Sequence, residues 1–526
     1  MTIDIKHLPD NVGDLKEIII DLYKHVKEQE KQAQKYELVI ESLKEQINIL
    51  KAELFGNSSE NLKEEKPDKI QVFNETEQDA PEEKEELTEV AAHSRRKGGR
   101  KPLPENLPRI DIIHELDKKD RIHGCGREMK EIGEEVTEKL RIIPQKVMVE
   151  VHHRKKYACE CEGVETEGIE GAVRIAPLEP SMIPQSIATS SLLADILTGK
   201  FCDALPFYRQ EKIFTRIGLE LPRQTMCHWA IKVYERAKPM LKIMEENIRA
   251  GPVIGMDETP VQVLNEKDRK NTTKSYMWVA RGGRTGKPVL LYRYNPTRSA
   301  EFLVDNLKGY NGYLQCDGYP AYDKQGILKD RDIKLVGCWA HVRRKFFKVT
   351  KATKNSSIAN KALKRIKLLY KIEEKARLES ISPDKIKALR QRESKKIVED
   401  FKDWIDTLVN VIPPKSTLGK AIAYTRNEWP KLIVFLEDGR IPIDNNLVEN
   451  AIRPFVVGRK NWLFSGSPRG ADASAGLYSI IETAKANGLE PFWYLLHLFN
   501  NLPKAKTPSD YEALIPFNVD KSKLQS

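Results

Sequence analysis

The chain has 526 residues, of which 40% are hydrophobic and 31% charged, so it can build several hydrophobic cores and is not globally disordered. It contains no run of about 18 apolar residues, no apolar N-terminal signal segment and only seven cysteines, which favours the reducing cytoplasm over a membrane or secreted location. The net charge of +11 favours a polyanionic partner.

Residues 13–55 are predicted to form a coiled coil. Two mostly apolar series recur every seven positions, offset by four: Leu15, Leu22, Gln29, Tyr36, Leu43 and Leu50, and Ile19, Val26, Ala33, Ile40, Ile47 and Leu54. β-Branched residues at most a positions and leucine at most d positions are typical of parallel two-stranded coiled coils. The alternative is one long helix packed on its own protein, but the polar flanks favour a homodimer or higher oligomer.

Residues 56–104 are predicted to be a disordered linker, first acidic and then basic. Positions 60–90 hold twelve Asp or Glu against four Lys, a charge block without a periodic pattern. A glycine-rich basic strip follows, made of Arg95, Arg96, Lys97, Arg100 and Lys101. This strip has two interpretations: it contacts DNA phosphates or a minor groove, or it is a solvated linker that balances the acidic charge.

Residues 105–180 are predicted to form a small β-rich, zinc-ribbon-like module, because 146–159 alternate like a strand. Structural zinc uses four ligands, usually in two close pairs. The candidates are His123, Cys125, Cys159 and Cys161, with His114, His152 and His153 as substitutes. The spacing is irregular, so a module that folds without metal and keeps ordinary thiols is the alternative.

Residues 181–250 are predicted to be helical, with two helices around a short turn. The second helix opens with Arg223, Gln224 and Thr225, which suits a pair of helices that reads DNA. Two helices that simply pack together would show the same pattern, so the sequence leaves both interpretations open.

Residues 251–349 are predicted to form the first part of an α/β core. The expected strands are 252–263, 275–283, 287–296 and 312–323, then a strand running into a basic helix over 333–347, and the expected crossover helix is 299–310. Three antiparallel strands, a crossover helix and a further strand are the order of an RNase H-like fold. In that order the first and fourth strands are neighbours, so Asp257 and Asp317 are expected to face each other.

The segment 442–454 offers a third carboxylate. Asp444 or Asn445 can cap a helix that carries Glu449, with Arg453 one turn later. Two Asp and one Glu that converge would repel one another, and two divalent cations relieve that repulsion. Carboxylates favour Mg²⁺ or Mn²⁺, and two such ions catalyse in-line phosphodiester displacement.

Several stretches together resemble one enzyme family. They are IGMDETPVQV, YLQCDGYPAY, GCWAHVRRKF, GRKPLPENLPR and, above all, the long segment 441–498 that begins IPIDNNLVENAIRP. The chain resembles transposases of insertion-sequence family 66, which belong to the DDE class, and the resemblance covers nearly the whole chain. It implies Asp257, Asp317 and Glu449 as the metal-binding catalytic triad.

The resemblance also implies a helical insertion at about 350–440, C-terminal core helices at 441–500 and a tail at 501–526. The family's Cys/Asp-x-x-His motif falls on Cys338 and His341. His341 would orient a scissile phosphate or a catalytic acid, or be a buried structural histidine. The expected active-site and DNA contacts are Arg343, Arg344, Lys345, Arg453, Arg459 and Lys460.

One departure concerns the zinc module. Ile122 stands where the family has the first cysteine, and the second pair is C-x-C instead of C-x-x-C. Four-ligand zinc sites depend on such spacing, so this departure argues against zinc binding and against the module's part in recognising terminal repeats.

The predicted function is a DNA transposase that binds the terminal inverted repeats of its element. It would hydrolyse phosphodiesters there and use the freed 3′-hydroxyl to attack target DNA. Small accessory proteins of the same element are expected partners. Two alternatives stay open: an RNase H-like nuclease or resolvase that cuts without joining, and a non-catalytic DNA-binding regulator.

Overall fold

The computed structural model describes residues 11–55, 146–158, 173–319, 322, 333–352 and 357–524. The whole predicted linker 56–104, with its basic strip, lies outside these residues, as do the zinc candidates His114, His123, Cys125, Cys159 and Cys161. The chain divides into two compact units, residues 1–77 with 180–526, and residues 78–179. Among the described helices, none combines the length and the apolar character needed to cross a membrane.

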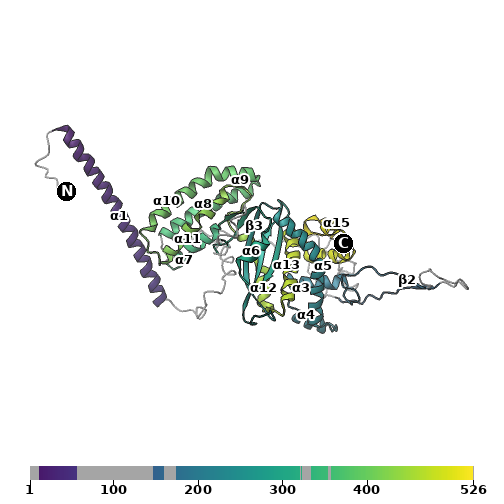
Figure 1. Cartoon of the computed structure of the whole chain (residues 1–526). Coiled ribbons are helices and arrows are strands. Elements are labelled where there is room, and N and C mark those ends of the chain that lie inside the picture. Colours follow the sequence, from purple (N-terminus) through teal and green to yellow (C-terminus); the bar gives the residue numbers. More distant parts are fainter. Residues whose placement is uncertain are drawn as a thin grey trace, which may run out of the picture. The chain divides into compact units, whose positions relative to one another are not determined.

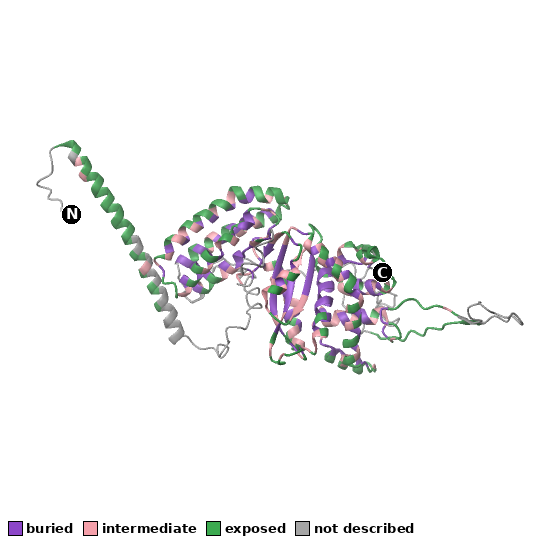
Figure 2. Cartoon of the chain, in the orientation of Figure 1, coloured by how far each residue is buried: buried purple, intermediate pink, exposed green. Residues whose placement is uncertain are grey.

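The N-terminal helix α1 (Val12–Phe55) is continuous over 44 residues (Figure 1). Both heptad series therefore lie on a single helix. Several large apolar residues of the repeat, such as Ile19, Leu22, Val26 and Leu43, are 42–62% exposed, and Figure 2 shows this helix as mostly exposed where it is described. Such a stripe is what the partner helix of a coiled coil covers, and self-association of α1 stays a prediction.

The described part of residues 78–179 contains a short antiparallel ladder. β1 (Lys156–Ala158) pairs with β2 (Val173–Ile175), and Arg154 Nε donates to the Ala176 carbonyl at 2.8 Å beside it. Residues 146–155 continue outside the ladder. The strand is therefore shorter than the alternating pattern of 146–159 predicted, because alternation alone does not supply a pairing partner.

A mixed sheet forms the centre of the larger unit (Figure 1). Its strands are β3 (Val253–Val263), β4 (Lys274–Gly282), β5 (Val289–Asn295), β6 (Gly312–Gln315), β7 (Ile333–Val336) and β8 (Phe464–Ser465). The order is β5-β4-β3-β6-β7, with β8 also paired to β3. β3, β4 and β5 are antiparallel, whereas β6 and β8 run parallel to β3, and β7 runs parallel to β6. The chain is thus a mixed α/β protein, as predicted, with the crossover helix α6 (Ala300–Asn306) between β5 and β6.

Helices pack on the sheet and along its β5 edge. Besides α6, they are α3 (Ser190–Phe201), α4 (Phe207–Arg216), α5 (Arg223–Arg249), α12 (Asn446–Trp462), α13 (Pro468–Ala486), α14 (Pro491–Asn501) and α15 (Pro508–Ala513), with short turns η5 (Leu502–Lys504), η6 (Pro516–Asn518) and η7 (Lys521–Lys523). Ile248 of α5 lines a small cavity with Ile254 and Met256 of β3. On α13, Ser479 Oγ accepts the N–H of Tyr292 at 2.8 Å. This bond satisfies an amide of the edge strand, which would otherwise be open to pairing with another strand.

Residues 181–250, nearly all of which lie in helices or short turns, form three helices instead of the predicted two. α3 ends before Cys202 and α4 begins after Pro206. Ala204 between them has a φ of 55°, a left-handed conformation that interrupts a helix. α5 buries a stripe that includes Met226 and Trp229 in the main core, which favours the packing interpretation for this helix.

The chain between β7 and α12 forms a group of helices with its own hydrophobic core (Figure 1). Its elements are α7 (Trp339–Ala352), α8 (Ser357–Leu378), α9 (Pro383–Leu389), the π-helical turn η3 (Arg390–Ser394), α10 (Lys395–Val409), α11 (Thr417–Leu432) and η4 (Val434–Leu436). The side chain of Arg390 is only 2% exposed. It donates to both carboxylate oxygens of Glu373 at 2.8 and 2.6 Å, and to the carbonyls of Phe435 and Asp438. This buried cation ties α8 to the segment that follows α11.

Candidate active site

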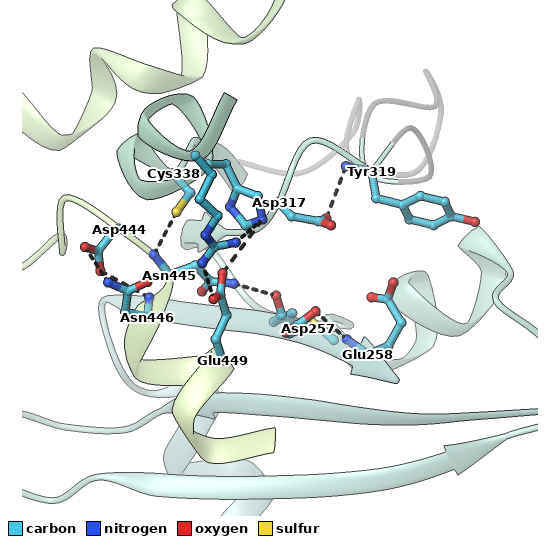
Figure 3. A network of polar contacts seen from close by, with 12 residues as sticks. Asp257, Glu258, Asp317, Tyr319, Cys338, Asp444, Asn445, Asn446 and Glu449 are labelled. Carbon is cyan, nitrogen blue, oxygen red and sulfur yellow. Dashed lines mark hydrogen bonds and ion pairs between the residues drawn. The ribbon is translucent and has the colours of Figure 1, made fainter. Parts of the chain in front are cut away.

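β3 and β6 bring Asp257 and Asp317 to the same level of the sheet. The two strands are parallel neighbours, with Gly255 paired to Gln315. Asp257 lies two residues after Gly255, and Asp317 lies two residues after Gln315. Both side chains therefore belong to the same face of the sheet (Figure 3). Each carboxylate accepts the N–H of a following residue, at 2.8 and 3.1 Å. The structure therefore brings the two predicted aspartates together.

Helix α12 places Glu449 in its first turn on this same face. A Cβ at Gly255 would lie 2.4 Å from Cγ2 of Val448, so the glycine is what lets α12 approach β3. Asn445, at the N-cap position, makes no side-chain cap. Its Nδ2 instead donates to the Met256 carbonyl at 3.3 Å and joins the helix to β3. Asp444, the residue before the N-cap, accepts the N–H of Asn446 at Oδ1 at 3.1 Å, a local turn contact that precedes the helix.

The electrostatics of Asp257 reflect this convergence. Burial raises the pKa of Asp257 well above its usual range, and the carboxylates of Glu258, Asp317 and Glu449 raise it further. A hydrogen bond from the backbone of Glu258 offsets only part of this effect. Without bound cations, burial and the neighbouring carboxylates therefore favour the protonated form of Asp257.

A second group of side chains surrounds Glu449 (Figure 3). Arg344 pairs with Glu449 Oε2, and Arg344 Nη1 lies 3.0 Å from His341 Nε2. His341 Nε2 in turn lies 3.8 Å from Glu449 Oε1. Burial, followed by the charge of Arg344, lowers the pKa of His341 to about 4, so the ring is neutral at physiological pH. Burial raises the pKa of Cys338 to about 12, which keeps it a thiol.

Two sets of residues that include Glu449 are candidate metal ligands. Cys338, His341 and Glu449 bring ligand atoms within 4.8 Å of one another. However, the Cys338 sulfur already accepts the N–H of Asn445 at 3.2 Å, and its proton is held tightly. The carboxylates of Asp257, Asp317 and Glu449 are hard oxygen donors, and Glu449 Oε1 is buried without a hydrogen-bond partner among the described residues. Hard divalent cations such as Mg²⁺ therefore fit the three carboxylates better.

One of the predicted cations of α12, Arg459, contacts β3. Arg459 Nη1 donates to Thr259 Oγ1 at 3.1 Å, two residues after Asp257 on the same face of β3. Arg453 is half-buried one turn after Glu449, and the next predicted cation, Lys460, is exposed. Arg459 was expected to contact a DNA phosphate, and in this structure it contacts the strand that carries Asp257.

The predicted cations of α7 differ in their surroundings. Arg344 pairs with a carboxylate, as described above. The guanidinium of Arg343 lies 5.9 Å from the ring centre of Phe347, and the ammonium of Lys345 lies 5.1 Å from that of Tyr424.

In the smaller unit, His152 and His153 are exposed. Their part in zinc binding stays a prediction, since the cysteines lie outside the described residues.

Several polar residues around the site were not predicted. Tyr370 of α8 donates to Asp444 Oδ2 at 2.8 Å, which links the insertion to the start of α12. Glu258, directly after Asp257, is buried and paired with Arg298. An acid next to a candidate catalytic aspartate is visible in the sequence, but its partner 40 residues away is not readable from one sequence.

Family comparisons cover most of the chain. Residues 185–473 match "Transposase IS66 family", and 479–517 match "IS66 C-terminal element". Residues 42–112 match "Transposase C of IS166 homeodomain". Residues 123–162 match "zinc-finger binding domain of transposase IS66", a stretch that contains all four first-choice zinc candidates.

Similar proteins include three from Sinorhizobium fredii strain NGR234. The protein y4qI is 31% identical, with 98% of this chain and 99% of y4qI covered. The protein y4jD is 34% identical, with 79% of this chain and 81% of y4jD covered, and y4hP is 27% identical, with 91% and 87% covered. All three carry the description "uncharacterized", so the family matches are what identify the class. The chain belongs to the IS66 family of transposases.

Proposed function

We propose that this chain is a DDE transposase that cuts phosphodiesters at the ends of its insertion sequence and joins the freed 3′-hydroxyl to target DNA. The observation that carries the proposal is the gathering of Asp257, Asp317 and Glu449 on one side of β3 (Figure 3). The strand order β5-β4-β3-β6-β7, antiparallel in its first half and parallel in its second, supports an RNase H-like core. Membership of the family supports the same reaction class.

The chemistry follows from the donor set. Asp257, Asp317 and Glu449 would hold two Mg²⁺ or Mn²⁺ ions, which supply a nucleophile and stabilise charge during in-line phosphoryl displacement. Arg344 neutralises Glu449 when no cation is bound. Arg344 would also contact a phosphate beside Glu449, since a guanidinium binds phosphate oxygens well. His341, being neutral, would hydrogen-bond a scissile phosphate without adding charge.

The remaining parts of the chain suit DNA as the partner. A coiled coil of residues 13–55 would pair two copies, and so two element ends. The basic strip at 95–101, Arg343, Lys345, Arg453, Arg459 and Lys460 would contact phosphates. The module at 105–180 would bind zinc and help to recognise terminal repeats. Such an enzyme would act in the bacterial cytoplasm, together with small accessory proteins.

The triad is tested by removing one carboxylate charge at a time. Asp257→Asn and Glu449→Gln should abolish Mg²⁺-dependent cleavage and joining of terminal-repeat DNA while leaving DNA binding unchanged. Asp403→Asn, at an exposed position of α10, is the matched control and should keep full activity. Cleavage by the Asp257 or Glu449 variants at the wild-type rate would refute the assigned triad.

The same assay separates the two alternatives. A nuclease or resolvase would cleave the terminal repeats but never form joined products, whatever the metal. A regulator would bind the repeats and cleave nothing under any condition. The proposed transposase forms both cleaved and joined DNA, and it loses both products when either Asp257 or Glu449 is replaced.

A further inference from the structure

Glu258 is a buried carboxylate on the far side of β3 from Asp257. Because side chains alternate along a strand, Asp257 faces α12 and Glu258 faces the opposite layer. The Glu258 side chain is 1% exposed and pairs with Arg298, and the hydroxyl of Tyr322 lies 3.5 Å from its Oε2. Burial, only partly offset by Arg298, raises the pKa of Glu258 to about 7. A buried ion pair contributes little net stability, so a positional role is the better explanation for it.

Arg298 connects this carboxylate to the loop that carries Asp317. Its guanidinium lies 3.4 Å from the centre of the Tyr319 ring, a stacked cation–π contact. The Tyr319 hydroxyl also donates to the Arg298 carbonyl at 3.3 Å. The backbone N–H of Tyr319 donates to Asp317 Oδ1 at 3.1 Å. A continuous line of contacts thus runs from Glu258 through Arg298 and Tyr319 to Asp317.

The two aspartates differ in how firmly the sheet holds them. Asp257 lies inside an 11-residue strand and is paired with Val279 of β4. Asp317 lies two residues beyond β6, a strand of four residues that ends at Gln315. Its position therefore depends on loop contacts, of which the bond from Tyr319 is one (Figure 3).

We propose that Glu258 is a positioning residue for the metal site: its side chain holds Asp317 through Arg298 and Tyr319, while its backbone N–H holds Asp257. The backbone N–H donates to Asp257 Oδ1 at 2.8 Å. One residue thereby sets the relative position of two ligands from adjacent strands. Contacts that orient ligands in this way affect metal affinity about 10–100-fold. The inference rests on the proposed function, because it assumes that these aspartates bind the catalytic cations.

The test uses Glu258→Gln and Arg298→Met in the full chain. Both should raise the Mn²⁺ concentration for half-saturation about 10-fold, measured by electron paramagnetic resonance of free Mn²⁺. The Mg²⁺ dependence of terminal-repeat cleavage should shift by a similar factor, with the rate largely restored at saturating Mg²⁺ and DNA affinity unchanged. The double variant should be no worse than either single one, because both changes break the same line of contacts.

The matched control is Glu266→Gln. Glu266 is also a buried acid of this sheet region, with a 4% exposed side chain 3.0 Å from Arg269, but it lies away from both aspartates. It should lower the melting temperature without changing Mn²⁺ half-saturation. Equal shifts for the Glu258 and Glu266 variants, or a Glu258 variant that loses only thermal stability, would overturn the inference. Wild-type protein that neither binds Mn²⁺ nor cleaves would overturn the proposed function, and this inference with it.

Discussion

Removing the charge of Asp257 should stabilise the protein when no divalent cation is present. Asp257→Asn is nearly isosteric and keeps the oxygen that accepts the backbone N–H of Glu258. It removes the repulsion with the carboxylates that raise the pKa of Asp257, among them Asp317 and Glu449. At an effective dielectric constant of about 20, two like charges about 6 Å apart repel by about 2–3 kcal/mol. Since Arg344 neutralises Glu449, we expect a net gain of about 1–3 kcal/mol in the free energy of unfolding.

The pH dependence of this gain has a defined sign. A carboxyl whose pKa is raised in the folded protein contributes stability below its unfolded pKa, and that stability is lost as the pH rises through the folded value. Wild-type protein therefore becomes relatively less stable towards pH 8, whereas the amide that replaces the Asp257 carboxyl does not titrate. The advantage of Asp257→Asn should be largest at pH 8 and shrink as the pH falls through the raised pKa of Asp257.

Scanning calorimetry of the full chain measures this effect. In EDTA at pH 8, the melting temperature of Asp257→Asn should exceed that of wild type by a few degrees. With Mn²⁺ at about 100 times its dissociation constant, wild type should gain about 2.7 kcal/mol and the variant much less. The exposed control Asp403→Asn should follow wild type throughout. A variant that is less stable than wild type in EDTA, or that gains as much from Mn²⁺, would refute the reasoning.

Three further changes probe other parts of the chain. Replacing Leu22 and Leu43 by Lys should give monomers by light scattering, because both are exposed positions of the repeat, and an unchanged mass would exclude this coiled coil. Arg390→Met should lower the free energy of unfolding by about 3–5 kcal/mol in urea titration, since it removes the buried donor that pairs with Glu373 and with two carbonyls; a loss below about 1 kcal/mol would contradict that role. Arg344→Gln should tighten Mn²⁺ binding about 3–10-fold by calorimetry, because it removes the cation that competes for Glu449, and weaker binding would show that Arg344 supports the metal site instead.

The strands of the core were predictable because their patterns are local. The stretch 252–263 was expected to be a strand because it begins with a short apolar run, and β3 covers Val253–Val263. The expected strand 312–323 was too long, since β6 ends at Gln315. Its apolar character continues to Cys316, but its partner β7 ends opposite Gln315. Strand length thus depends on the neighbouring strand, which a single sequence does not reveal.

The candidate site was predictable only on one side of the sheet. Asp257, Asp317 and Glu449 were proposed because acids that follow apolar runs or stand in the first turn of a helix are visible in the sequence, although Asp257 lies inside β3 and not at its end. Glu258 is visible only as an acid beside Asp257, and its pairing with Arg298, 40 residues away between β5 and α6, is not readable from one sequence. Arg344 was expected on DNA for the same reason: its charge is visible in the sequence, whereas its partner, 105 residues away, is not.

The insertion explains how two ligands so distant in sequence reach one site. Its beginning and its end are held together beside β6: the N–H of Trp339 donates to the carbonyl of Ile443 at 3.2 Å, and Gln315 Nε2 donates to the Pro442 carbonyl at 2.9 Å. The N–H of Asn445 also reaches the Cys338 sulfur. These bonds close the insertion at its base. The length of the insertion therefore adds only a small loop-closure cost to the free energy of folding, and it does not change the position of Glu449. The start of α12 is therefore set by the residues that follow β7 and by β3, the strand that carries Asp257.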